Sequence, residues 1–167
     1  MPDLMRLARH LVLPHWWVVR RTFPPRTLAA VERAIAESEA THGGEIRFVV
    51  EGALDLLPVW RGQTPRDRAI DVFSLLRVWD TDDNSGVLIY VQLVDRSVQI
   101  VADRGIAKRV AQTEWDRVAG ILESAFRRRA YAQGAVEAVD AVTRLLAAHF
   151  PPPAGNPNEL PDRPVVL

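Results

Sequence analysis

The chain contains no cysteine in its 167 residues, and this absence removes several kinds of chemistry at once. It excludes thiol nucleophiles, disulfide bridges and metal sites built from thiolates. A chain of this length buries enough apolar surface in one domain to fold without a disulfide or a structural metal. We therefore expect one ordinary globular domain.

The chain also lacks a charge surplus of either sign, since 21 basic side chains balance 21 acidic ones. A dedicated nucleic-acid-binding protein needs a basic surplus to displace the counterions of its ligand, so we expect no nucleic-acid partner. The longest apolar run, residues 86–93, is too short to span a bilayer. No signal-peptide pattern opens the sequence, and we expect a cytoplasmic protein.

Several familiar sites are missing as well. The sequence contains no phosphate-binding loop of the Walker type, no dinucleotide-binding glycine motif and no G-x-S-x-G nucleophile elbow. Its four histidines are scattered, and no two of them have the spacing of metal ligands. They are His10, His15, His42 and His149. The sequence therefore shows no pair of a nucleophile and a base.

The periodicity of the apolar residues predicts alternating helices and strands. The predicted elements are a helix from 24 to the glycines at 43 and 44, a strand over 45–51, a loop over 54–63, a helix from 64 to 79, a strand over 86–94, a tight turn at 95–96, a strand over 97–102, a helix beginning at 113 and a helix over 131–149. This order predicts the α/β class, as an α/β/α sandwich with a small mixed β-sheet that includes a central hairpin.

Three parts of the chain differ in composition. Residues 24–150 hold all the strongly periodic segments and form the predicted domain. Residues 151–167 contain six prolines and predict a flexible tail. Residues 1–23 predict a helical or extended segment.

The N-terminal segment allows two interpretations. Leu4, Leu7, Leu11 and Val12 predict one short helix face, and two tryptophans and two arginines follow at 16–17 and 20–21. One interpretation is a membrane-surface anchor with aromatic rings at the interface and arginines on phosphates. The other is a segment that packs on the core. We favour packing, because the polar face is short and weakly charged for an interfacial helix, and we do not expect contact with a membrane surface.

One cluster of oxygen-bearing side chains stands out, at residues 80–86. Asp80, Asp82, Asp83 and Asn84 are ligands that suit a hard cation such as Ca²⁺ or Mg²⁺. The spacing imitates the start of an EF-hand loop, but the glycine comes one residue late and the twelfth position is Val91. An aspartyl-phosphate D-x-D motif fits no better, because here the pattern follows a helix.

The predicted hairpin brings a second acidic segment to this cluster. If the chain turns at 95–96, residue 103 lies near residue 88 on the neighbouring strand. Asp103 and Arg104 then emerge at the same end of the sheet as residues 82–84. We therefore predict a cation site formed by Asp80, Asp82, Asp83, Asn84 and Asp103, with Arg104 available for an anion. The alternative is that these residues are ordinary turn formers that bond their own backbone.

Three stretches of the sequence resemble the TPM domain family. The first is the Asn-x-Gly-Val-Leu pattern at 84–88, and the second is Val-Gln-Ile-Val-Ala-Asp-Arg-Gly-Ile at 98–106. The third runs from Phe126 to Gly134 and is similar to the closing helices of the family. The resemblance covers about residues 24–150 and looks closest to short bacterial members that lack a signal peptide.

The resemblance implies an α/β sandwich and a choice of activities. Relatives in the thylakoid lumen are described as acid phosphatases, some relatives bind divalent cations, and others are accessory proteins at membranes. This sequence departs from the family pattern at Ala107 and Lys108, where relatives carry a glutamate and a glycine. A carboxylate that the family places near the predicted site is therefore replaced.

Two functional hypotheses remain. The first is a non-catalytic accessory module that binds a protein partner and has a candidate Ca²⁺ or Mg²⁺ site. The second is a metal-dependent phosphoester hydrolase, in which the acidic cluster holds the cation and Arg104 binds the phosphate. The replaced carboxylate and the missing nucleophile–base pair favour the first hypothesis.

Overall fold

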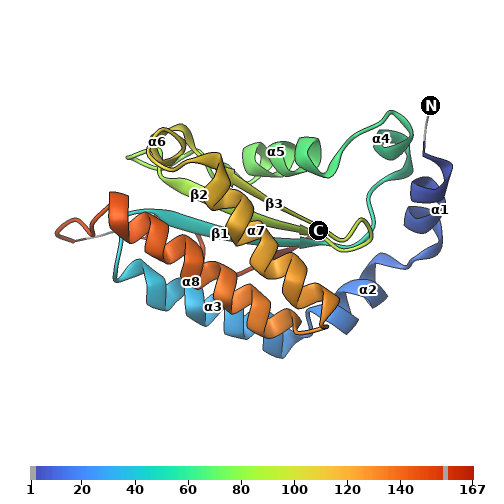
Figure 1. The fold of residues 1–167 in the computed structure, drawn as a ribbon, viewed down its shortest axis with the longest axis horizontal. Coiled ribbons are helices and arrows are strands. Elements are labelled where there is room, and N and C mark those ends of the chain that lie inside the picture. The colour runs from blue at the N-terminus through green and yellow to red at the C-terminus, as the bar shows by residue number, and fades with distance from the viewer. Residues whose placement is uncertain (1–2, 156–157) are drawn as a thin grey trace.

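The computed structural model of the protein describes residues 3–155 and 158–167, and it shows an open sheet with helices on both faces (Figure 1). Residues 1–2 of the predicted N-terminal segment and residues 156–157 of the predicted tail lie outside the described residues. Among the described residues, no helix has both the length and the apolar character needed to cross a membrane.

The sheet has four strands in the order β3-β2-β1-β4. They are β1 (Glu45–Glu51), β2 (Gly86–Gln92), β3 (Ser97–Ala102) and β4 (Val165–Val166). β1 pairs in parallel with β2 and with β4, while β2 and β3 form an antiparallel hairpin. The predicted mixed sheet is therefore confirmed, with one arm of the hairpin inside the sheet and the other, β3, at its edge.

Three helices cover one face of the sheet. They are α3 (Pro25–Glu39), α7 (Gln112–Arg127) and α8 (Tyr131–His149). Alternation along β1 sends Ile46, Phe48 and Val50 to this face, where all three are fully buried in the larger of two hydrophobic clusters. The apolar stripe of α7 formed by Trp115, Val118 and Leu122 packs here as well.

The opposite face is covered by α5 (Pro65–Leu75), which forms a second hydrophobic cluster with the sheet. The helix begins as predicted: Thr64 accepts a hydrogen bond from the backbone N–H of Asp67, whose carboxylate accepts from the N–H of Thr64. Two covered faces confirm the α/β/α sandwich. Figure 1 shows the two layers, with α5 above the sheet and α3 and α8 below it.

Several local features differ from the prediction. Two short helices, α4 (Leu56–Trp60) and α6 (Arg104–Ala107), lie where the sequence predicts no helix. The hairpin loop has four residues, 93–96, so β2 ends at Gln92. α7 begins at Gln112, one residue before its predicted start, and has no side-chain cap. The N-terminal segment forms two helices, α1 (Leu4–Val12) and α2 (His15–Thr22).

The C-terminal residues are more ordered than their prolines indicate. β4 pairs with β1, and Leu160 is buried in the second hydrophobic cluster. Glu45 at the start of β1 accepts hydrogen bonds from the backbone N–H groups of Glu159 and Leu160, at 3.1 and 3.2 Å. The flexible tail expected from composition is therefore replaced, over residues 158–167, by a segment bonded to the sheet.

The docked C-terminal segment predicts a pH effect through Glu39. Burial, followed by a hydrogen bond and negative charge from Asp162, raises the pKa of Glu39 to about 8. The folded state thus favours the protonated acid. The free energy of unfolding therefore falls as pH rises from about 4.5, the pKa of this group in the unfolded chain, through about 8, its pKa in the folded protein. Urea unfolding at pH 6 and pH 9 measures this loss, and Glu39→Gln should remove about 1 kcal/mol of it.

Glu37 lies exposed on the same helix, so Glu37→Gln is the matched control and should leave the pH dependence of stability unchanged. An equal pH dependence in wild type and Glu39→Gln would contradict the assignment.

Candidate functional site

The acidic loop and the end of the hairpin lie side by side, as the sequence predicts. The Asp103 N–H donates to the Gly86 carbonyl at 2.8 Å, and the Gly105 N–H donates to the Asn84 carbonyl at 2.9 Å. Residue 103 therefore lies beside residue 86, two positions from the predicted partner, because the hairpin loop is longer than a tight turn. The shift leaves Asp103 and Arg104 at the same end of the sheet as the acidic loop.

Glycine at position 105 makes this close approach sterically feasible. A Cβ atom there would lie 2.3 Å from the Asp83 carbonyl oxygen and 2.5 Å from that of Asn84. Asn84 itself has a φ of 52°, in the left-handed region that asparagine tolerates better than most residues. Both features fix the acidic loop against the first turn of α6.

The side chains at this junction bond mainly to one another and to the backbone. Asp103 is 9% exposed, and its Oδ1 atom accepts from the backbone N–H of Arg104 at 2.7 Å. The Arg104 Nε atom donates to Asn84 Oδ1 at 2.9 Å. The other Asp103 oxygen, Oδ2, is buried and has no hydrogen-bond partner among the described residues. It is the group at this junction best placed to accept a ligand.

The remaining carboxylates of the predicted cation site do not gather around Asp103. Asp82 and Asp83 are exposed, and Asp80 pairs with Arg77 at 2.6 Å. Within residues 3–155 and 158–167, no three His, Cys, Asp or Glu side chains gather in a way that could hold a metal ion. The side chains have the right chemistry for a hard cation, but they do not surround a common point, and the cation site stays a prediction.

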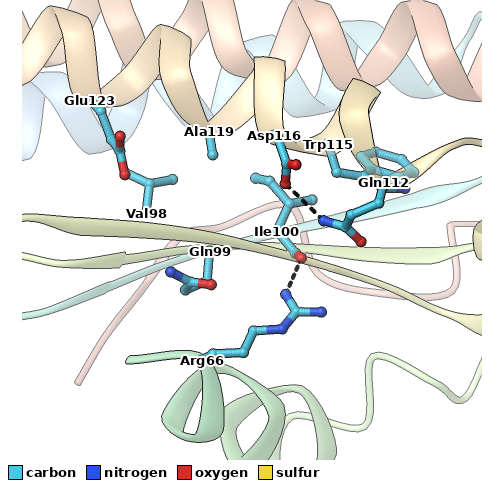
Figure 2. Close-up of a pocket in the computed structure, with 9 residues that line it drawn as sticks. All are labelled: Arg66, Val98, Gln99, Ile100, Gln112, Trp115, Asp116, Ala119 and Glu123. Atoms are coloured by element: carbon cyan, nitrogen blue, oxygen red, sulfur yellow. Dashed lines mark hydrogen bonds between the residues drawn. The ribbon is translucent and has the colours of Figure 1, made fainter. Parts of the chain in front are cut away.

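A pocket of about 270 Å³ lies along the edge strand β3, between α5 and α7. Figure 2 shows Arg66 reaching from α5 to the Ile100 carbonyl, with Trp115 and Asp116 on α7 across the strand. The Trp115 side chain is buried, and its indole N–H has no hydrogen-bond partner in the described part of the chain. Of the other tryptophans near helix ends, Trp60 and Trp79 are exposed rather than core.

The TPM domain matches residues 20–145, which is most of the chain. This chain belongs to the TPM domain family. The finding confirms the resemblance carried by the acidic loop and the hairpin, both of which lie inside the matched region.

A solved structure supports the same assignment. The TPM domain described here is similar to the NMR structure of the BA42 protein from the psychrophilic bacterium Bizionia argentinensis. The sequence identity is 29%, the TM-score is 0.71, and the match covers 85% of this chain and 93% of the other. No curated protein matches the chain.

The match to the TPM domain begins at residue 20, so α1 and most of α2 precede it. Figure 1 shows these helices at one end of the molecule, and α1 contacts α4 there. We call α1, α2 and α4 the apolar arm, because they carry nine of the thirteen exposed large apolar side chains found among the described residues.

A buried polar cluster fastens the apolar arm to the TPM domain. Asp95, in the hairpin loop, accepts three hydrogen bonds from the Arg6 guanidinium at 2.7–3.1 Å. His10 Nδ1 accepts from the Leu54 N–H at 2.9 Å, which leaves its Nε2–H to donate to Asp95 Oδ1 at 3.2 Å. Arg6 also donates to the Gln63 carbonyl at 2.6 Å. The sequence analysis missed this cluster, because the pattern around Asp95 predicts only a turn.

The electrostatics of Asp95 follow from these contacts. Burial alone raises the pKa of Asp95, but hydrogen bonds from His10 and Arg6 and the charge of Arg6 outweigh it and hold the pKa at about 2. The carboxylate is therefore charged at all physiological pH values. It stabilises the fold above its unfolded pKa, and this stabilisation is lost as pH falls through about 2.

The junction at Gly105 predicts a steric effect of a single methyl group. Gly105→Ala places a Cβ against two carbonyl oxygens, so it should lower the free energy of unfolding by about 2 kcal/mol in urea titrations. Gly120→Ala is the matched control, because no atom lies within 4 Å of a Cβ there. It should stabilise its helix by about 1 kcal/mol. Equal effects of the two substitutions would contradict the close approach.

The polar cluster predicts that one carboxylate controls the docking of α1. Asp95→Asn should lower stability by about 2 kcal/mol, because charged hydrogen bonds are lost in a buried place. Amide hydrogen exchange should also accelerate in α1 but not in β1 or β2. Glu114→Gln, which breaks an exposed ion pair with Arg117, should cost under about 0.5 kcal/mol. Unchanged exchange in α1 would show that Asp95 does not hold it.

Proposed function

We propose that this TPM-domain protein is a non-catalytic accessory module that binds a partner through the apolar arm. The observation that carries the proposal is the concentration of exposed large apolar side chains on α1, α2 and α4. Soluble domains rarely gather such side chains at one end unless the surface has an occupant. Scattered single residues, such as Leu75 on α5, need no such account.

The bonding at the acidic loop supports a structural role for that region. Asn84 Oδ1 and Asp103 Oδ1 both accept hydrogen bonds from Arg104, and Asp80 is paired with Arg77. These contacts hold the loop and α6 together. A Ca²⁺ or Mg²⁺ ion bound through Asp103 and the acidic residues of the loop would reinforce the same junction, and we propose such a site as an accessory feature.

A metal-dependent phosphoester hydrolase is the alternative. It is favoured by the buried Asp103 Oδ2 atom, which lacks a protein hydrogen bond among the described residues, and by the exposed side chain of the next residue, Arg104. A carboxylate oxygen of this kind is a donor for a hard cation, and arginine binds phosphate oxygens well. We rank it second, because Ala107 replaces the family glutamate near this site.

Two further properties carry over from the sequence as proposals. The neutral overall charge supports the absence of a nucleic-acid partner. We also propose a cytoplasmic location.

A phosphatase assay separates the two functions. We expect the pure protein to show no sustained hydrolysis of p-nitrophenyl phosphate with Ca²⁺, Mg²⁺ or Mn²⁺ present, since no nucleophile–base pair is available in the sequence. Calorimetry with the same ions measures the cation site independently, and Asp103→Asn should weaken any binding there. Metal-dependent turnover that is lost in both Asp82→Ala and Asp103→Asn would overturn the non-catalytic assignment.

A further inference from the structure

Helix α1 is turned so that its apolar face points away from the protein. Leu4, Ala8 and Leu11 follow one another at the spacing of a single helix face, and Met5 and Val12 flank them. All five are exposed, Met5 by 79% and Val12 by 72%. A helix at the surface of a domain normally turns such a face inward. The apolar side of α1 is therefore left for an occupant outside the described chain.

The opposite, polar face of α1 is the one that is buried. Arg6 and His10 lie on it, and both bond to Asp95 in the hairpin loop. Rotation of α1 to bury its leucines would leave the Asp95 carboxylate without these partners in a place where burial is costly. The outward direction of the apolar face is thus fixed by the fold and does not reflect a loosely attached end.

The neighbouring helices extend this apolar surface. Trp16 and Trp17 on α2 are 62% and 45% exposed, and Trp60 on α4 is 52% exposed. Leu56 and Leu57 on α4 are exposed as well, and α4 contacts α1. Three tryptophans on two short helices give this end of the molecule rings with an apolar body and a polar N–H.

Positive charge accompanies the apolar side chains. Residues 3–26 contain five arginines and only one acidic residue, Asp3, although the whole chain is neutral. Arg6 pairs with Asp95, and the other four arginines of this segment are exposed. They are Arg9, Arg20, Arg21 and Arg26. The Arg21 guanidinium lies over the Trp17 ring, 5.4 Å from its centroid.

We propose that the apolar arm docks on the surface of a lipid bilayer that contains anionic lipids. Leucine, methionine and valine side chains enter the boundary between headgroups and acyl chains, and tryptophan rings lie at headgroup level. Exposed arginines bind the phosphates of the headgroups and are attracted by the surface potential. The inference rests on the proposed function, because it names the partner of the same surface.

Charge also argues against a second copy of the chain as the occupant. Two arms that met face to face would bring the three exposed arginines of α1 and α2 in each copy together. Only the two N-cap aspartates of each arm, Asp3 and Asp55, would offset them. An anionic bilayer satisfies the apolar and the charged side chains at once. The sequence alone favoured packing of this segment on the core, and Val19 and Phe23 do pack there. The outward apolar face of α1 is the observation that adds a lipid surface to this interpretation.

Sedimentation of the full chain with lipid vesicles tests the proposal. One set of vesicles contains phosphatidylcholine alone, and the other contains phosphatidylcholine with a minor share of phosphatidylglycerol. We expect binding to the second set, reduced by added salt, with a blue shift of tryptophan emission. The double variant Leu4→Glu/Leu11→Glu should bind at least about tenfold more weakly. Both positions are exposed, so circular dichroism and urea unfolding should match wild type.

Leu75→Glu is the control, because Leu75 is 65% exposed on α5, outside the apolar arm, and should bind vesicles like wild type. Equal binding to both vesicle compositions would overturn the anionic assignment. No binding, or equal binding by Leu4→Glu/Leu11→Glu, would overturn the lipid surface as partner. Light scattering that shows a dimer lost in the double variant would assign the arm to a second copy instead. None of these results bears on phosphatase turnover, so the two proposals fail separately.

Discussion

The complete burial of two parallel strands is the constraint on which the rest of the structure depends. Every residue of β1 and β2 is buried, so helices must cover both faces of the sheet. Burial extends to polar side chains of β1, and each of these needs a partner. Glu51 is bonded by Arg68 of α5 and by the hydroxyl of Tyr90, and Arg47 donates to carbonyls of the C-terminal segment. The polar residues of β1 thus hold the outer layers in place.

The hairpin built on β2 connects the two regions of functional interest. At one end, the register that pairs residue 87 with residue 102 brings Asp103 and Arg104 against the acidic loop. At the other end, the loop of residues 93–96 presents Asp95 to α1. One antiparallel pair therefore fixes the candidate ligand site and the orientation of the apolar arm. The two lie at opposite ends of the sheet and can serve different partners.

Much of this could be predicted from local patterns. The strand at 45–51 and the helix at 131–149 have the predicted bounds, and the helix predicted from residue 64 has Thr64 as its N-cap. Asp103 and Asn84 could be brought together because antiparallel pairing follows from a short loop. Asp95 could not be identified, since its partners Arg6 and His10 are more than 80 residues away in sequence. The ordered β4 was hidden by prolines that indicate disorder.

The sequence by itself determined the periodicities, the class of fold and the family, because these depend on neighbouring residues and on short motifs. It also determined that α1 has one apolar face and one polar face. Only the tertiary structure decided which face of α1 turns outward. That choice depends on which contacts with the rest of the protein stabilise the fold more, those of the charged side chains or those of the leucines. A carboxylate in a distant loop made the polar face the inner one. The same long-range packing left the acidic side chains of residues 80–83 facing solvent instead of converging on Asp103.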